Sequence, residues 1–434
     1  MTALQPLSPP PGPWAPPLIG HSLRFLRAGG AFFADQRARY GPVFTVHLFG
    51  APTVVVSGAE ATRFVLTQEG RLFGPRWPPS TARLLGRKAI TTQSGAVHAQ
   101  RRRLFAQVLG RRELAGSLPR VEEIAREHLA VWAAHPEVTL VPLLNRYAMA
   151  VACAVVLGEG AAVEAYRSTF STWGEGLFSL PINLPFTAFG RALQAREALL
   201  ALIRARLDQG DRGSDMASVL LRAVGEEGQP LDREELADQL LTLLFAGHDT
   251  SSSTLSSFFL LIAQHPAVRA RLVAEQAAFD PAQPLRLEDL EAMPFLRQTL
   301  NEVMRIYPPV AGVFRKVEQD CSFGGWRFPA GWAVLVALGL NHNDPAVFPE
   351  PTRFDPDRFA PEAVAGRDRF AFLPFGAGPR VCAGLDYAWL ETGVLAALAL
   401  RTLDWRLLPG QDLSMTLIPL PRPRDGLRLA LERR

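Results

Sequence analysis

A long apolar stretch from Asp232 to Gln264 constrains the fold more than any other part of the chain. It opens with DREEL and closes before His265-Pro266, so it predicts one helix about 50 Å long. Both ends of this helix are apolar nearly all round, and such a helix has to be buried. A membrane span is the alternative, but the polar run GHDTSSST in its middle makes that costly unless those groups line a cavity.

The rest of the chain is typical of a mainly helical protein with small β-sheets. VFTVHL and TVVV flank a turn and predict one hairpin, and WRFPAGWAVLVAL predicts a second. The 434 residues are 48% hydrophobic, which is enough for a large core. No linker, long charge run or repeat divides the chain after its Pro-rich opening. We therefore expect an extended arm over residues 1–20 and a single domain over residues 21–434.

Composition argues against several other classes of protein. The chain shows no signal-peptide pattern and no apolar run of about 18 residues free of polar groups, so we expect a soluble, cytoplasmic protein. Cys153, Cys321 and Cys382 lie far apart, without a CxxC pair or histidines at zinc spacing, which argues against a disulfide scaffold or a zinc site. A net charge of +4 without a basic stripe argues against nucleic-acid binding.

The polar run in the long helix indicates a site. Gly247 removes a side chain where a bulky group could lie against the helix, and Asp249 and Thr250 place a carboxylate and a hydroxyl beside it. A helix kink, with serines bonded back to main-chain carbonyls, explains the same residues equally well.

Two further motifs are ambiguous when taken alone. FGAGPRVCAG sets Cys382 among glycines and a proline, which also fits a turn with a buried cysteine. Glu302 and Arg305 lie three residues apart, as a surface ion pair would. Arg358 in FDPDRF could instead complete a buried Glu-Arg-Arg network, in which one carboxylate bridges two guanidinium groups.

Together these motifs resemble the cytochrome P450 haem-thiolate monooxygenases. AGHDT, the ExxR pair and the P-x-R-F element follow in the order and spacing of that family. The resemblance implies the cytochrome P450 fold, with haem b (iron protoporphyrin IX) between the long helix and the cysteine loop. The ligand loop F-x-x-G-x-R-x-C-x-G is matched at all five fixed positions, namely Phe375, Gly378, Arg380, Cys382 and Gly384.

The same resemblance implies how the cofactor is held. Cys382 would ligate the iron as a thiolate, which pushes electron density toward the metal. Histidine stands at position 98 where the family usually has tryptophan, and it keeps a hydrogen-bond donor there. For Arg101 and Arg103, on the same helix, we expect a solvated face. The groups expected to bind the haem propionates are His98, Arg102, Arg315 and Arg380.

The resemblance also implies chemistry and partners. Thr250 would organise dioxygen and water while Asp249 relays protons, so that one oxygen atom enters a hydrophobic substrate. Electrons would come from a separate ferredoxin or flavodoxin, because the chain has no room for a reductase domain. A haem-thiolate sensor without turnover is the alternative, but a sensor has no need of a proton relay.

Three stretches resemble one branch of the family, the retinoic-acid hydroxylases and their cyanobacterial relatives. They are RWPPSTARLLG with the HAQRRR helix, GLFSLPINLPFTAFGRALQAR, and PPVAGVFR. This implies a retinoid, an apocarotenoid or another isoprenoid as substrate, with a fatty acid or terpenoid as the alternative. Arg76 could hold a terminal carboxylate or simply be solvated. The expected apolar lining, any member of which could instead be ordinary core, is Trp77, Phe178, Leu180, Pro181, Ala246, Val310, Val313, Phe314 and Leu420.

Overall fold

The structure is a computed structural model that describes residues 7–16, 20–158, 163–213, 215–224, 229, 231–280, 283–417 and 419–434. The chain divides into two compact units. The first contains residues 1–78 and 304–382, and the second contains residues 79–303 and 383–434. Each unit combines two segments that are far apart in sequence. The single domain expected over residues 21–434 remains a prediction.

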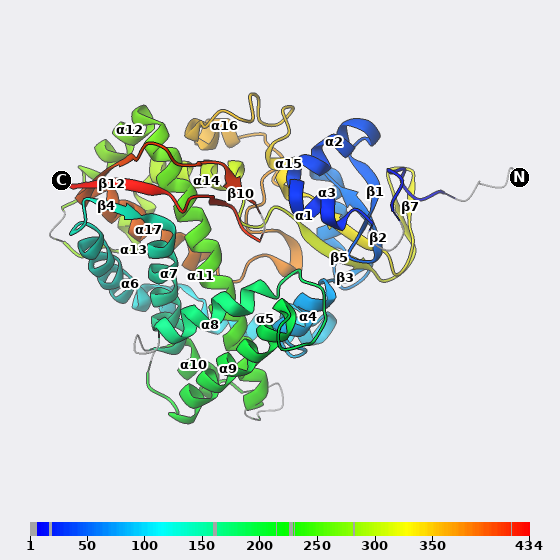
Figure 1. Cartoon of the computed structure of the whole chain (residues 1–434), viewed down its shortest axis with the longest axis horizontal. Coiled ribbons are helices and arrows are strands. Elements are labelled where there is room, and N and C mark those ends of the chain that lie inside the picture. The colour runs from blue at the N-terminus through cyan, green and yellow to red at the C-terminus, as the bar shows by residue number, and fades with distance from the viewer. Residues whose placement is uncertain are drawn as a thin grey trace, which may run out of the picture. The chain divides into compact units, whose positions relative to one another are not determined.

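A five-stranded sheet forms the centre of the first unit (Figure 1). The hairpin predicted from VFTVHL and TVVV is confirmed, with Val43 opposite Val56. In sheet order the strands are β1 (Val43–Leu48), β2 (Ala51–Val56), β8 (Ala333–Val336), β5 (Val313–Val317) and β3 (Phe73–Pro75).

The second predicted hairpin is wrong. Its two halves form β7 (Trp326–Phe328) and β8, which do not pair with each other. β7 pairs with β6 (Cys321–Phe323), whereas β8 runs parallel to β2 and antiparallel to β5. All four residues of β8 are buried, so this strand gains more from the interior of the larger sheet than from a local turn.

Helices cover both faces of this sheet because successive side chains of a strand point to opposite faces. Val54 and Val56 pack in one cluster with Val65 of α3 (Ala59–Thr67), while Val55 packs in another with Phe33 of α2 (Gly30–Tyr40). The other helical elements of this unit are α1 (Ser22–Ala28), α15 (Leu338–His342), η1 (Pro356–Phe359), α16 (Pro361–Val364) and η2 (Gly378–Arg380).

The second unit is mainly helical and is built around the predicted long helix, α11 (Arg233–Gln264). Its α-helices are α4 (Pro79–Leu85), α5 (Gly95–Val108), α6 (Arg111–Trp132), α7 (Leu140–Leu157), α8 (Val163–Glu175), α9 (Ala188–Asp208), α10 (Met216–Arg222), α11, α12 (Pro266–Gln276), α13 (Leu287–Glu291) and α17 (Leu385–Thr402). α14 (Pro294–Ile306) carries the boundary between the units. Short strands complete this unit, namely β4 (Glu137–Thr139), β9 (Leu403–Leu407), β10 (Met415–Thr416), β11 (Arg422–Pro423) and β12 (Arg428–Arg433).

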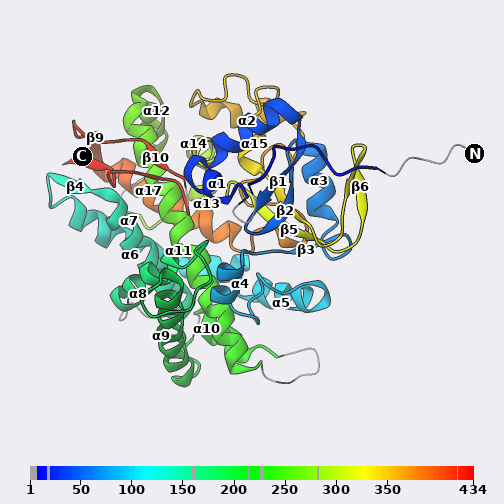
Figure 2. The same cartoon turned by 45° about the vertical axis from the view of Figure 1, so that its right-hand side comes forward.

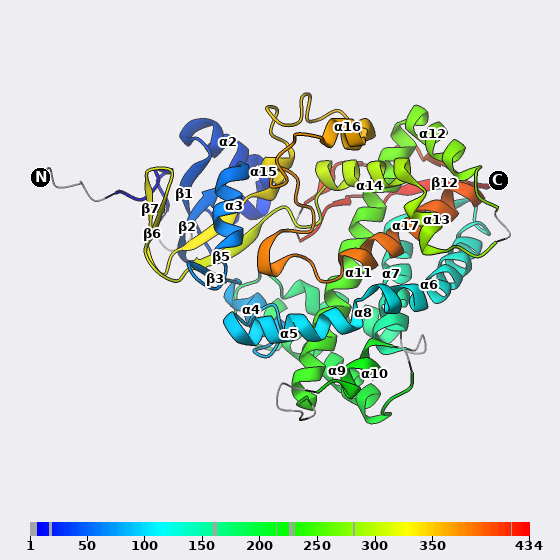
Figure 3. The same cartoon turned by 180° about the vertical axis from the view of Figure 1, so that it is seen from behind.

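Several helices bury α11. α9 and α10 lie beside its N-terminal half (Figure 2), and α7 and α17 pack against it from other sides (Figure 3). Most of its residues from Ser251 to Ile262 are completely or nearly completely buried, as the apolar pattern predicts. The helix ends at His265, because Pro266 cannot continue it.

Among the described helices, only α7 is long and apolar enough to cross a membrane. It packs against α11, and 61% of its apolar window is buried inside the protein. Its composition is therefore explained by its place in the core. α11 does not meet the same test, so the alternative interpretation of α11 as a membrane span is not supported.

Candidate active site

The cysteine loop, residues 375–382, belongs to the first unit. The main-chain N–H of Cys382 donates to the carbonyl of Phe375 at 2.8 Å and closes the loop. Gly376 and Gly378 each have φ of +71°, which favours glycine. A Cβ atom on Gly378 would lie 2.2 Å from the carbonyl oxygen of Leu66, at the end of α3. The loop is therefore tightly turned and pressed against main chain, and Gly378 cannot be replaced without movement.

Only one of the three cysteines is exposed. Cys153 is buried in α7, and burial raises the pKa of its thiol to about 12. Burial also raises the pKa of Cys321, on β6. Cys382 is exposed at the end of its loop. Since a metal ligand must be a thiolate, Cys382 is the cysteine whose position suits this role.

Two predicted cofactor-binding arginines meet in the first unit. Arg315 projects from β5 and Arg380 from the cysteine loop, and both pair with Glu69, which lies between α3 and β3. The Nε–Oε distances are 2.6 Å for Arg315 and 2.5 Å for Arg380. Burial lowers the pKa of Arg315, although the Glu69 carboxylate opposes this shift. Sequence reasoning missed Glu69, because its bond to Arg380 spans 311 residues.

The polar run of α11 places Asp249 beside His248. The Nε2 atom of His248 lies 3.2 Å from Oδ1 of Asp249, and the Nδ1 atom of His248 bonds to the carbonyl of Leu244 at 2.8 Å. Burial disfavours both charges, yet each residue stabilises the charge of the other. The pKa of Asp249 is consequently lowered and that of His248 is raised. The pattern GHDT did not single out His248.

The hydroxyl of Thr250 donates to the carbonyl of Ala246 at 2.7 Å. A Cβ atom on Gly247 would meet no atom within 4 Å, so there is open space beside this residue. Gly247 thus leaves free space on the helix beside the carboxylate and the hydroxyl, and the site on α11 remains a prediction.

α11 continues through the serines that follow, and their hydroxyls bond to neighbouring elements. Ser251 donates to Oε2 of Glu391 on α17 at 2.6 Å, and Ser253 donates to the carbonyl of Pro421 at 2.7 Å. Ser252 bonds to Asn145 of α7. The serines therefore tie α11 to its neighbours. The expected bonds from serines back to helix carbonyls are wrong for these three residues, and the kink itself stays a prediction.

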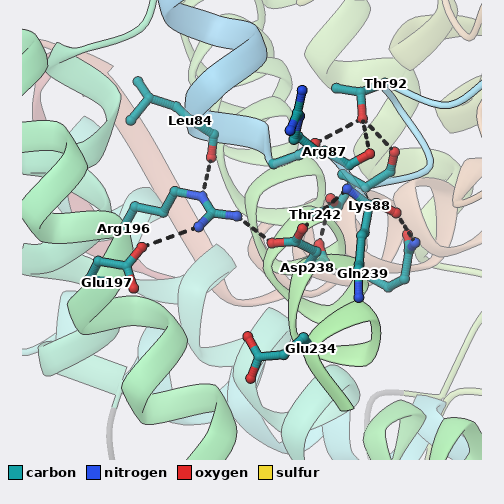
Figure 4. Close-up of polar contacts among 12 residues, drawn as sticks. Leu84, Arg87, Lys88, Thr92, Arg196, Glu197, Glu234, Asp238, Gln239 and Thr242 are labelled. Carbon is teal, nitrogen blue, oxygen red and sulfur yellow. Dashed lines mark hydrogen bonds and ion pairs between the residues drawn. The ribbon is translucent and has the colours of Figure 1, made fainter. Parts of the chain in front are cut away.

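The segment before α5 is fixed to α11 by polar contacts (Figure 4). Gln239 donates to the carbonyl of Lys88 at 2.6 Å and accepts from the N–H of Ile90 at 3.0 Å. Asp238 pairs with Arg196 of α9 and accepts from the N–H of Lys88 at 3.4 Å. These contacts position α5, which carries His98 and Arg102. His98 is buried and Arg102 is partly buried.

Arg101 does not lie on a solvated face, contrary to expectation. Its side chain is only 13% exposed, and its Nη2 atom lies 2.6 Å from Oε2 of Glu235 on α11. The α5–α11 interface therefore contains a buried ion pair that the arginine-rich sequence did not distinguish from surface charge.

Glu302 and Arg305 of α14 are completely buried, so they are not a surface pair. Arg305 donates to the carbonyl of His342 at 3.0 Å and lies over the ring of Phe348. Arg358 donates to the carbonyl of Glu350 at 3.0 Å. The structure thus places both arginines in main-chain contacts of the first unit, and the carboxylate bridge from Glu302 remains a prediction.

The expected pocket residues fall into both units. Val313 and Phe314 lie on β5 and pack against the two sheet clusters, with Trp77 and Val310 in the same unit. Phe178 donates its N–H to the hydroxyl of Thr81 on α4 at 3.3 Å. The remaining residues of the set lie in the second unit. Leu420 is partly buried, whereas Leu180, Pro181 and Ala246 are exposed.

These residues fit haem b. The exposed Cys382 offers a sulfur ligand, and the buried guanidinium pair matches the carboxylates that the porphyrin carries. No cluster of three or more metal-ligating side chains occurs in the described ranges that would indicate another metal site. A cysteine that can ligate iron, together with arginines that can pair with propionates, is typical of haem-thiolate proteins.

The chain belongs to the cytochrome P450 family, whose model matches residues 9–429. The mainly helical fold with small sheets is therefore the cytochrome P450 fold, and the cofactor is haem held by a cysteine thiolate. The protein is a monooxygenase that uses a hydrophobic substrate, dioxygen and electrons from a redox partner. When bound, the haem iron supplies the activation of dioxygen.

Known relatives cover nearly the whole chain. It is 42% identical to cytochrome P450 120 of Synechocystis over 99% of this chain and 98% of that protein. It is 33% identical to cytochrome P450 26B1 of Bos taurus over 96% of this chain and 85% of that protein. A solved structure described as retinoic acid bound cyanobacterial CYP120A1 matches with a TM-score of 0.94 and 41% identity, covering 99% of this chain and 100% of that one.

Proposed function

We propose that the protein hydroxylates a long, mostly apolar isoprenoid, with a retinoid as the leading candidate and an apocarotenoid next. One observation carries this proposal most strongly. The similar solved structure, 41% identical and matched over essentially its full length, is described as bound to retinoic acid. A fatty-acid or terpenoid hydroxylase is the alternative, because an apolar pocket accepts those ligands as well.

The site residues have the following proposed roles. Cys382 is the axial thiolate, and Phe375, Gly378 and Gly384 shape the turn that presents it. The propionates are bound by His98, Arg102, Arg315 and Arg380. Glu302, Arg305 and Arg358 support the fold around the cysteine loop.

Asp249 and Thr250 are proposed to deliver protons. The lowered pKa of Asp249 keeps the carboxylate ionised, so that it can accept a proton from solvent and pass it on. The Thr250 hydroxyl, which donates to Ala246, can accept a hydrogen bond through its lone pairs. This relay favours an enzyme over a haem-thiolate sensor, which has no use for it.

Arg76 is the proposed contact for a terminal carboxylate. It precedes Trp77, it is partly buried, and burial lowers its pKa. A guanidinium in such a place binds a carboxylate more strongly than one in bulk water. Trp77 and the other expected lining residues provide aromatic and branched surface, which suits a stiff polyene because a rigid ligand loses little conformational entropy on binding.

The electron donor is proposed to be a separate ferredoxin or flavodoxin, and the location is proposed to be cytoplasmic. An acidic donor would associate with a protein rich in arginine through long-range attraction. Raising the salt concentration should therefore slow reduction, since screening weakens such attraction.

A binding experiment tests the substrate class. Retinoic acid, retinol and palmitic acid are titrated into the ferric protein while the spin state of the iron is followed by absorbance. The proposal expects retinoic acid to bind most tightly, and retinol more weakly because it lacks the carboxylate. Tighter binding of palmitic acid than of either retinoid would instead support the fatty-acid alternative.

A further inference from the structure

A single buried carboxylate, that of Glu69, joins the two arginines beside the cysteine loop. Its side chain is 4% exposed, and those of Arg315 and Arg380 are 10% and 11% exposed. One carboxylate oxygen contacts Nε of Arg380 and the other contacts Nε of Arg315. Both contacts use the guanidinium atom nearest to the main chain. Glu69 therefore fixes the direction of the Arg380 guanidinium group through a hydrogen bond, and it holds the Arg315 guanidinium group beside it through an ion pair.

Arg315 is held at a second point as well. Its Nη1 atom donates to the carbonyl of Phe314 at 2.8 Å. The ion pair with Glu69 and this hydrogen bond therefore hold the guanidinium group of Arg315 at two different atoms. Because the folded protein already restricts this group, the group loses little further conformational entropy when it binds a carboxylate.

The segment that carries Glu69 also supports the cysteine loop. The carbonyl of Leu66 lies against Gly378 so closely that no side chain fits there. Three residues later, Glu69 pairs with Arg380, two positions from Gly378. Two independent contacts thus attach this segment to residues only four and two positions before Cys382. A change at Glu69 should therefore be transmitted to the loop that presents the thiol.

The charge of Glu69 matters because its surroundings are dry. Two guanidinium groups and one carboxylate carry a net charge of +1. Charges that are removed from water interact over longer distances and are weakly screened by salt. Reduction adds an electron to the haem iron, and a negative charge held in a dry site against the cysteine loop would disfavour that addition.

We propose that Glu69 is a positioning residue for the haem. It orients Arg315 and Arg380 toward the propionates, and its negative charge lowers the reduction potential of the iron. This role concerns the cofactor, so it stands whether or not the substrate is a retinoid. It assigns a function to a residue that has no place in the ligand-loop, ExxR or long-helix motifs.

The test compares holoprotein carrying Glu69→Gln with wild type by spectroelectrochemistry. Glutamine keeps the shape of glutamate and removes the charge. We expect a tenfold larger equilibrium constant for one-electron reduction, which corresponds to a potential about 59 mV higher. The shift should persist at high salt. We also expect faster transfer of haem to apomyoglobin, because two arginines lose the group that orients them.

Glu318→Gln is the matched control. Glu318 makes a 2.8 Å ion pair with Lys316 on β5, but its side chain is 42% exposed. The same change of acid to amide should leave both the potential and the rate of haem transfer as in wild type. If Glu69→Gln also leaves the potential unchanged, the electrostatic role is wrong. If it leaves the transfer rate unchanged, the positioning role is wrong.

Glu69→Asp keeps the charge but shortens the side chain, so that one carboxylate cannot reach both guanidinium groups as before. This variant tests the role of Glu69 if the Glu69→Gln protein cannot be produced with bound haem. We expect a potential close to that of wild type together with faster haem transfer. A variant that only unfolds at lower temperature, with both haem measurements as in wild type, would show that Glu69 is merely structural and would overturn the proposal.

Discussion

His248 and Asp249 are consecutive residues of α11, and their side chains form a contact of 3.2 Å between Nε2 and Oδ1. The pair stabilises an ionised carboxylate next to Thr250, because the positive charge of the imidazolium attracts it and outweighs the loss of solvation. The carboxylate of Asp249 likewise raises the pKa of the His248 ring. Between the lowered pKa of the acid and the raised pKa of the ring, both groups are charged. This range is where we expect proton delivery to work.

Replacing His248 should shift the pH dependence of turnover. In His248→Gln the imidazolium is lost, so the pKa of Asp249 rises and the carboxylate is protonated at higher pH than before. The acid limb of the activity profile should therefore move to higher pH. Product formed per electron donor consumed is measured from acid to neutral pH. His128→Gln, which changes a histidine on α6, serves as the control, and profiles that coincide for wild type and His248→Gln would refute the role of this pair.

Replacing Gly378 should disrupt the cysteine loop. Alanine at this position is strained by the positive φ, which costs about 1 to 2 kcal/mol of stability. Its Cβ atom would also clash with the carbonyl oxygen of Leu66. Gly366→Ala is the matched control, because Gly366 has φ of +84° but open space around its Cβ position. We expect both variants to lose stability in urea and only Gly378→Ala to lose haem. Equal haem content in the two variants would show that the contact with Leu66 does not shape the loop.

Replacing Trp77 should weaken retinoid binding. Loss of a large aromatic contact commonly costs about 2 kcal/mol, which is roughly a thirtyfold change in affinity. Trp77→Ala should therefore bind retinoic acid about thirtyfold more weakly, with unchanged haem content, as followed by the spin-state titration. Trp14→Ala is the control, because Trp14 is 78% exposed. If both variants bind as wild type does, Trp77 does not belong to the pocket.

Glu391 should make stability depend on pH. It is buried on α17, and burial raises its pKa to about 8, although the bond from Ser251 opposes this. In the unfolded chain its pKa is near 4.3, so between about pH 4.3 and 8 only the folded state holds the proton and stability falls as pH rises. The free energy of unfolding of Glu391→Gln should fall less steeply over this range. Glu123→Gln, on the exposed face of α6, should follow wild type.

The curves of unfolding free energy against pH are measured by urea titration of the holoproteins. The slope that Glu391 adds is at most about 1.4 kcal/mol per pH unit. Parallel curves for wild type and Glu391→Gln would show that the carboxyl group is ionised in the folded protein at neutral pH.

The sequence predicts best what depends on near neighbours. The apolar run from Asp232 to Gln264 predicts α11 almost to its ends, because a proline stops the helix. The β1–β2 hairpin follows from two short β-favouring runs and a turn. The resemblance of the cysteine loop to the family's ligand motif predicts Cys382 as the thiolate ligand, because the motif is contained within a few residues.

The rest depends on contacts between residues that are far apart in sequence. β8 leaves β7 and pairs with β2 and β5, and nothing in its local pattern distinguishes these partners. The sequence around Arg101 resembles that of a solvent-exposed arginine. In the folded protein, however, the Arg101 side chain is only 13% exposed and pairs with Glu235. Glu69 has no motif at all, because Arg315 and Arg380 reach it only after the chain has folded.

Turnover under labelled dioxygen tests the proposed reaction most directly. The holoenzyme is supplied with a ferredoxin and its reductase, with 18O2, and with retinoic acid and palmitic acid in equal amounts, and the products are analysed by mass spectrometry. We predict a retinoid product that carries one 18O atom, with palmitic acid largely unchanged. Label found mainly in hydroxylated palmitic acid, or a retinoid that binds but acquires no label, would contradict the account.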